Sequence, residues 1–188
     1  MPSTESDDPR PTGGEASDVL LRRAHELMLT RATWTRGHLA RDRHSYPVSP
    51  TSSRAVRFCA GGALIRAAAD EFNLVVRTSQ GDKPVTLGKE RALHEAYRRL
   101  GIVMVELLAP SERMRVHEER RGDLLIPIFS HRKSAADPWI AEAGETTWES
   151  VVHTMNDAKT VTHRTVSFCL NVARAIADVP PTIDQLEE

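Results

Sequence analysis

The chain has 188 residues, of which 40% are hydrophobic and 5% aromatic, and its formal net charge is −1. This length is typical of a single domain with a real core that is poor in rings. No apolar run approaches the roughly 18–20 residues that cross a bilayer, so we expect no membrane partner. The first residues are polar and acidic, unlike a secretory signal or a transit peptide. We therefore expect a cytoplasmic protein.

The charge is distributed unevenly along the chain. Residues 19–66 hold nine Arg and two acids, a local charge of +7, whereas residues 134–188 have a local charge of −6. A basic segment of this kind is typical of a surface that binds an anionic ligand or nucleic acid. The alternative is that the two segments pack together and neutralise each other. The 21 Arg against 4 Lys also suggest a GC-rich coding sequence, so only the location of the arginines needs a physical reason.

In chain order, residues 1–17 are rich in Pro, Gly, Ser and acids, and we predict a disordered tail. Asp18 has the position of an N-cap for a helix over 19–29, where apolar residues recur at helical spacing. Residues 30–52 lack periodicity and contain two prolines, which oppose a helix. A short strand or an extended loop over Trp34–Ala40 is the prediction there.

The next predicted helix runs over about 54–71, with Val56 and Cys59 on its apolar stripe. Gly61 and Gly62 lie inside it, and each costs about 1 kcal/mol there relative to Ala. Close approach of another backbone is the usual reason for such glycines. The alternative is that the helix begins at Gly62, with Cys59 at its mouth.

The middle of the chain mixes strand and helix signals. We predict, in order, a strand over Leu74–Arg77, a helix from Thr86 to 99, a charged loop over 110–123 and an edge strand over Leu124–Phe129. Residues Ile102–Leu108 either extend the helix or form a strand after Gly101. Their β-branched side chains favour the strand slightly.

Two helices close the chain, one over Thr147–Asn156 and one over Thr162–Ala177, where Thr162 is the N-cap. The predicted fold is mainly α, a small helical domain with a minor β element in an inserted region. A single domain is expected over 18–179, with a variable insertion at about 71–146. A loose acidic tail follows at 180–188.

Three short motifs occur together: W-T-x-G at Trp34–Gly37, C-A-x-G-A-L at Cys59–Leu64 and N-D-A at Asn156–Ala158. In combination they resemble a bacterial family of small uncharacterised proteins, a domain of unknown function. Met155 departs from the pattern, because the family often has Trp before Asn-Asp. The resemblance brings no activity, but it implies that the N- and C-terminal parts form one domain and meet in space.

Cys59, His153 and Asn156 supply the groups of a cysteine hydrolase: a thiol, an imidazole base and an amide that orients the base. A helix that begins near Gly62 would lower the pKa of the Cys59 thiol. The competing interpretation makes Cys59 a small core residue, since free cysteines are usually buried. We favour this second interpretation, and with it a non-catalytic binding or regulatory module, with the hydrolase as the alternative.

A second hypothesis concerns binding. The predicted binding residues are Trp34, Arg36, Arg41, Arg57 and Asp157. Loop arginines bind phosphates or single-stranded bases, so an anionic ligand or nucleic acid is the partner class, and a nucleic-acid-associated protein is the second alternative. We also expect a buried Asp157 that pairs with Arg36 or Arg41. A homo-oligomer is left open.

No cofactor fingerprint is present, and two cysteines without C-x-x-C spacing exclude a cysteine-based zinc site. Among eight histidines, His38 and His44 lie near Asp42 and were the best candidate metal ligands. Scattered surface histidines are the commoner explanation of this pattern. We therefore expect no metal and no cofactor.

Overall fold

The structure is a computed structural model that describes residues 13–72, 87–108, 114–121, 124–131, 140–141 and 147–176. Its helices are α1 (Gly13–Leu27), the 3-10 turn η1 (Arg31–Thr33), α2 (Ala60–Phe72), α3 (Leu87–Leu108), α4 (Trp148–Asp157) and α5 (His163–Ala175). The prediction of a mainly α fold with minor β structure is confirmed. Within the described ranges, none of these helices has the length and apolar character needed to cross a bilayer.

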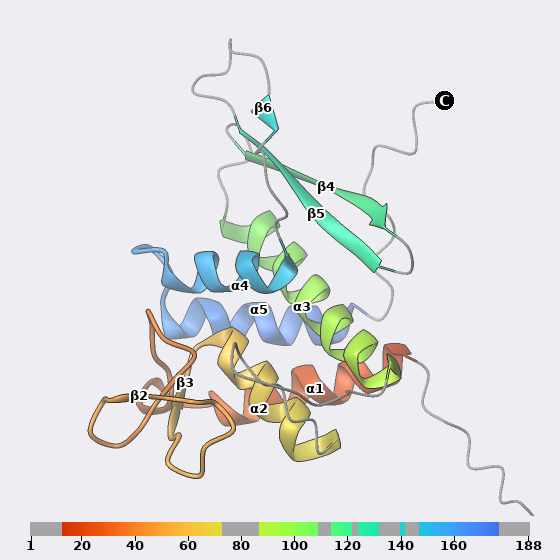
Figure 1. Ribbon diagram of the computed structural model, residues 1–188. Coiled ribbons are helices and arrows are strands. Elements are labelled where there is room, and N and C mark those ends of the chain that lie inside the picture. Colours follow the sequence, from red (N-terminus) through yellow and green to blue (C-terminus); the bar gives the residue numbers. More distant parts are fainter. Residues whose placement is uncertain are drawn as a thin grey trace, which may run out of the picture.

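The five α-helices form one core. α3 packs against the other four, and α1 also packs against α2 and α5. Each helix contributes at least one fully buried large side chain, represented by Leu20, Leu64, Leu100, Trp148 and Leu170. Figure 1 shows a long β-hairpin at one end of this helical body and a small sheet at the other.

α1 begins at Gly13, six residues before the predicted start at 19, so residues 13–17 are helical and not part of a disordered tail. Ser17 is buried and donates its hydroxyl hydrogen to the carbonyl of Gly14. Asp18 does not cap the helix, because its carboxylate pairs with the buried Arg99 of α3. The rest of the predicted tail, the strand over Leu74–Arg77 and the tail 180–188 lie outside the described residues.

α2 begins at Ala60 and not at 54, so the alternative of a later start is close to the structure. Cys59 precedes the helix: its carbonyl accepts from Ala63 N–H at 2.9 Å and its Sγ from Gly62 N–H at 3.3 Å. Val56 lies outside the helix and is exposed, contrary to the predicted stripe. The predicted close approach of a backbone is confirmed for Gly62, which lies against Leu39, whereas the nearest atoms to Gly61 belong to side chains.

α3 continues through Gly101 to Leu108, so the predicted strand after this glycine is wrong. A Cβ at Gly101 would lie 2.5 Å from the ring of Trp148, which shows why the helix has a glycine here. α3 falls in the range 71–146, where we expected an insertion. It is nevertheless the helix that contacts all the others, and therefore part of the core.

The charged segment predicted as a loop is a strand, β4 (Met114–Arg121), which pairs antiparallel with β5 (Leu124–His131). A third strand, β6 (Ile140–Ala141), joins β5 only at Ser130 and His131. Over Leu124–Phe129 the described partner is β4 alone, and this suits Pro127, which has no N–H to donate. Arg98 of α3 holds the hairpin through two bonds to Glu118, at 2.6 and 2.8 Å.

The small sheet has the order β2-β1-β3, with β1 (Ala40–Arg41) between β2 (Pro47–Val48) and β3 (Arg57–Phe58). Ala40 pairs with Val48 on one side and with Phe58 on the other. At the other end of the chain, Thr147 caps α4, and Thr162 caps α5 in a capping box with Thr165, so both predicted helices are confirmed.

Candidate functional site

Asn156, in the last turn of α4, joins the three motif segments. Its Oδ1 accepts hydrogen bonds from the indole N–H of Trp34, at 3.1 Å, and from the backbone N–H of Ala60, at 3.2 Å. Its Nδ2 donates to the carbonyl of Thr35, at 3.3 Å. The side chain is fully buried, so these bonds satisfy polar groups that water cannot reach. The N- and C-terminal parts therefore meet in space, as the family resemblance implies.

Asp157 lies beside this amide but at the surface, so the expectation of a buried carboxylate is wrong. Its Oδ1 accepts from the backbone N–H of Gly37, at 2.9 Å, and from Asn156 Nδ2, at 3.0 Å. Gly37 has φ +72°, a conformation that glycine adopts without strain. Asp157 thus holds the backbone of the W-T-x-G loop, and the segments meet through amide groups, without the ion pair that we expected with Arg36 or Arg41.

Trp34 and Arg36, two of the predicted binding residues, contact each other. The guanidinium carbon of Arg36 lies 4.9 Å from the centroid of the Trp34 ring, which is a cation–π arrangement. The ring of His163 lies 6.2 Å from the same tryptophan, at an interplanar angle of 56°. Trp34 is therefore half-buried and held by α4 and α5 together.

Cys59 is fully buried. Burial raises the pKa of its thiol to about 12, and the smaller effect of the Gly62 N–H hydrogen bond does not reverse this. The hypothesis of a cysteine hydrolase required a lowered pKa for this thiol, and the shift has the opposite direction. At neutral pH the group is a protonated thiol that caps the first turn of α2.

His153 and Asn156 do not complete a triad with Cys59. The amide of Asn156 is fully used by other partners, as described above, so it does not orient the imidazole. His153 lies over Gly61, with its Nε2 3.3 Å from where a Cβ would be. It lines a hollow of about 530 Å³ together with Gly37–Ala40 and Pro47–Pro50. Cys59 is not among the described residues that line this hollow.

The other two predicted arginines lie side by side. Arg41 of β1 and Arg57 of β3 are directly opposite each other in the antiparallel register. Arg41 donates to the carbonyl of Ser45, at 2.6 Å, and to Thr35 Oγ1, at 3.1 Å, while Arg57 donates to the carbonyl of Arg43, at 3.2 Å. All these acceptors are uncharged. Like charges at opposed positions destabilise a sheet, and within the described residues no carboxylate neutralises this pair.

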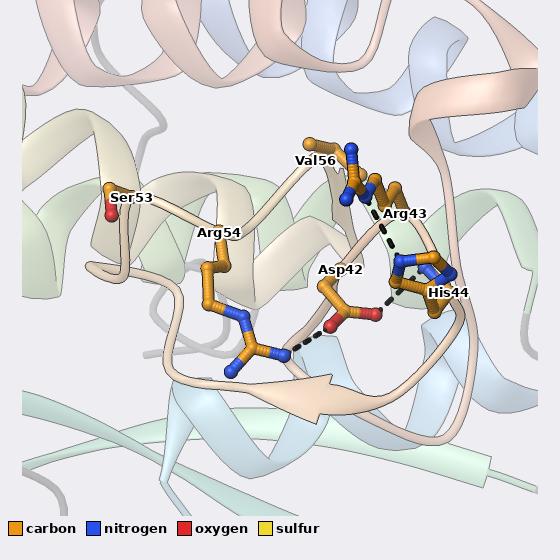
Figure 2. Close-up of a pocket in the computed structure, with 6 residues that line it drawn as sticks. All are labelled: Asp42, Arg43, His44, Ser53, Arg54 and Val56. Carbon is orange, nitrogen blue, oxygen red and sulfur yellow. Dashed lines mark hydrogen bonds and ion pairs between the residues drawn. The ribbon is translucent and has the colours of Figure 1, made fainter.

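A pocket of about 500 Å³ is built from residues that directly follow Arg41 and directly precede Arg57 in the chain, although neither of these two arginines is among its described lining residues. Figure 2 shows the side chains that line it: Asp42, Arg43, His44, Ser53, Arg54 and Val56. Arg54 reaches across the pocket to the Asp42 carboxylate, although two thirds of its side chain is exposed. Arg43 donates its Nε–H to Nε2 of His44, at 3.0 Å. The terminal guanidinium nitrogens of Arg43 are without a described partner and remain available to a ligand.

Asp42 organises the turn that carries these groups. It is 2% exposed and accepts from the backbone N–H groups of His44 and Tyr46, at 2.9 and 3.0 Å. Burial alone would raise its pKa, but the hydrogen bonds from Arg54, Tyr46 and His44 lower the pKa below the ordinary 3.8. We name the set of Arg41, Arg43, Arg54 and Arg57 the arginine face. This set brings four guanidinium groups together with one described carboxylate partner, that of Asp42.

The interpretation that segments 19–66 and 134–188 neutralise each other stays a prediction, because Glu149 and Asp157 are the acids of 134–188 that lie within the described residues. Arginines of the basic segment pair with acids that are close in sequence or on a neighbouring helix. Their described ion pairs are Arg22–Glu26, Arg23–Glu26, Arg23–Asp70, Arg23–Glu71, Arg54–Asp42 and Arg66–Asp70. Among the described residues, the ion pair between Arg54 and Asp42 is the one that involves the arginine face.

The candidate metal ligands are not brought together. Both oxygens of Asp42 are used by N–H groups and by Arg54, and Nε2 of His44 accepts from Arg43. In the part of the chain that the structure describes, no group of three or more His, Cys, Asp or Glu side chains is placed to hold a metal ion.

Arg43 and Arg54 belong to the basic segment 19–66 but are not among the binding residues predicted from the sequence. Their convergence depends on the turn that Asp42 holds, and on a loop that returns to β3. The signal that was present is the run Asp42–Tyr46, because an Asp that precedes a turn commonly accepts from the N–H groups two or more residues later.

The comparison with family models agrees with this arrangement. A model described as "Family of unknown function (DUF6197)" matches residues 13–176, a range that holds all three motif segments and every described helix. Neither the curated proteins nor the solved structures gave a match. The match extends over most of the chain, and the chain therefore belongs to this family of unknown function.

Proposed function

We propose that the protein is a non-catalytic binding module of the cytoplasm that holds an anionic ligand on its arginine face. The observation that carries the proposal is the pair of opposed arginines, Arg41 and Arg57, whose side chains donate only to uncharged oxygens. A bound anion would remove the repulsion between these two cations. Arginine is suited to this role because its planar donors match phosphate or carboxylate oxygens.

The pocket built from the residues next to Arg41 and Arg57 in the chain supplies further donors. Arg43 and Arg54 extend the positive surface, and the Ser53 hydroxyl lies at its edge. The Asp42 carboxylate holds Arg54 in the free protein. An incoming anion therefore competes with Asp42 for one guanidinium group and finds the others free of carboxylates.

The hollow lined by His153 supports the choice of the arginine face as the anion site, because its lining is different. It is of similar size, about 530 Å³, but its described lining contains no Arg or Lys and presents the histidines His38 and His153. The cytoplasm is supported by the two free cysteines, Cys59 and Cys169, since unpaired buried thiols suit a reducing compartment. The burial and raised pKa of Cys59 support a module without a thiol nucleophile.

Calorimetric titration with inorganic tripolyphosphate at low salt tests the proposal. We expect saturable binding that weakens steeply as salt is added, because charge carries the affinity. Arg41→Gln, Arg57→Gln and Arg54→Gln should each weaken binding by about tenfold, equivalent to about 1.4 kcal/mol. Asp42→Asn should tighten binding, since it releases Arg54 and keeps an oxygen for the two N–H groups.

The matched control is Arg120→Gln. Arg120 is exposed on β4, in the hairpin that lies at the far end of the molecule from the small sheet (Figure 1). It changes the net charge equally and should leave the affinity within about twofold. Absence of binding at millimolar tripolyphosphate, or an equal loss in Arg120→Gln, would overturn the proposal.

A further inference from the structure

We infer that the anionic ligand is single-stranded nucleic acid, whose phosphates contact the arginine face and one of whose bases stacks on Tyr46. This inference rests on the proposed function. Its starting observation is that the Tyr46 side chain is 65% exposed. An exposed aromatic ring beside a positively charged surface is the combination on which single-stranded bases stack.

The structure ties Tyr46 to the arginine face. Its backbone N–H donates to Oδ1 of Asp42, at 3.0 Å, and its carbonyl accepts from the N–H of Asp42, at 3.0 Å. The next residue, Pro47, pairs with Arg41 in the sheet. The same carboxylate that holds Arg54 therefore also holds the backbone that carries the ring.

The turn has a defined conformation. Ser45, the residue before the ring, has φ +71°, which is uncommon for a residue with a side chain. The guanidinium group of Arg41 donates to its carbonyl at 2.6 Å. These bonds place the ring of Tyr46 on a turn whose backbone is fixed on both sides. A fixed platform loses little conformational freedom when a base stacks on it.

The extent of the charge favours a strand over a single phosphate group. Residues 31–59 contain six Arg and one Asp, and no other Lys, Asp or Glu, which gives a net charge of +5 with histidines neutral. These arginines lie on short strands, on turns and, for Arg31, in the 3-10 turn η1, and no α-helix of the described chain carries them into a groove. Unstacked bases are available only in single strands, so a duplex lacks the partner that Tyr46 needs.

Fluorescence anisotropy with a labelled twelve-nucleotide oligothymidylate tests the inference, with the matching duplex and thymidine monophosphate as competitors. We expect the single strand to bind at least tenfold more tightly than either competitor. Tyr46→Ala should weaken binding of the single strand about tenfold, which is a modest loss for one base stack. Tyr46→Phe should keep the affinity of the parent protein. Tripolyphosphate binding should be the same in all three proteins.

The matched control is Phe168→Ala, which removes another exposed ring, on α5, outside the loop region. It should leave the affinity for the oligonucleotide unchanged. If Tyr46→Ala binds the strand as well as the parent protein does, the inference is overturned. If thymidine monophosphate competes as well as the strand, the ligand is a free nucleotide and the inference is equally overturned. In both cases retained tripolyphosphate binding would leave the proposed function intact, and its loss would remove both.

Discussion

Gly62 and Leu39 are in such close contact that a Cβ atom on Gly62 would lie 1.8 Å from the carbonyl oxygen of Leu39. The same carbonyl accepts the backbone N–H of Cys59, at 3.0 Å, one residue before α2 begins. The first turn of α2 is therefore built directly against the segment that leads into β1. This contact sets the position of the small sheet, and with it the arginine face, on the helical body.

Replacement of Gly62 by Ala should be strongly destabilising. The added methyl group would meet backbone that cannot move without breaking the small sheet, and we predict a loss of about 3 kcal/mol or more. Gly61→Ala is the matched comparison, because its methyl group would meet only side-chain atoms of His153 and Tyr97, at 3.3–3.4 Å. Urea unfolding should show a much smaller change for Gly61→Ala, and equal changes in the two variants would contradict the structure.

Asn156→Ala should cost about 2–4 kcal/mol, because it leaves the buried donors of Trp34 and Ala60 without an acceptor. The free energy of unfolding, measured with urea, checks this. Asn171→Ala is the control, since Asn171 is exposed on α5 and its removal should change stability by less than about 0.5 kcal/mol. A loss for Asn156→Ala no larger than that of the control would show that the amide does not join the segments.

Glu118→Gln should destabilise the protein by about 3 kcal/mol. The side chains of Glu118 and Arg98 are 5% and 6% exposed, so the substitution removes the bidentate carboxylate of a buried guanidinium group, whose other described carboxylate contact is Glu95, at 3.2 Å. Glu106→Gln, an exposed substitution on α3, should be nearly neutral. The prediction fails if thermal unfolding does not separate the two variants.

Thiol labelling tests the role of Cys59. With a pKa of about 12, only about one thiol in 10⁴ is ionised at pH 8, so labelling of the folded protein should be roughly 10³-fold slower than in urea. Cys169 is also buried, and burial raises its pKa to about 11, so neither thiol should react readily. The measurement is made on Cys169→Ser, so that only Cys59 reports. Rapid labelling at neutral pH would return the cysteine hydrolase to consideration.

The carboxylate of Asp42 predicts a dependence of stability on pH. Its pKa is lower in the folded protein than the ordinary 3.8, so its stabilising effect is complete above that value and is lost as the pH falls through the folded-state pKa. Urea midpoints between about pH 2 and 6 should fall less steeply in Asp42→Asn than in the parent protein. Parallel curves for the two proteins would show that this group does not contribute.

The helices near the C-terminus were predictable because their determinants are local. Thr147 and Thr162 cap through residues three positions later, and the buried face of α5 recurs at helical spacing. The start of α2 was not predictable, because its capping groups are the thiol of Cys59 and the side-chain amide of Asn156, which is distant in sequence. The strand β4 was not predicted for a related reason. Its charged residues indicated a loop, but Glu118 is buried in a pair with Arg98 of α3.

The sequence predicted some residues of the candidate site, but not how their side chains are arranged. Arg41 and Arg57 were named from the basic loop, but their opposition depends on a register between strands of two residues each, which no periodicity reveals. The buried contact between the segments that was expected of Asp157 is made instead by Asn156, whose amide both accepts and donates. Which side chains pair with each other depends on the three-dimensional fold, and the sequence of one segment alone does not reveal it.

The hydrogen bonds of Asn156 span 122 residues to Trp34 and 96 residues to Ala60. Contacts between segments so distant in sequence form late, because closing a long loop must precede any gain from the bond. The junction between the W-T-x-G loop and the start of α2 is thus completed only when α4 has docked. During synthesis, Trp34 and Ala60 would emerge from the ribosome well before the amide that joins them.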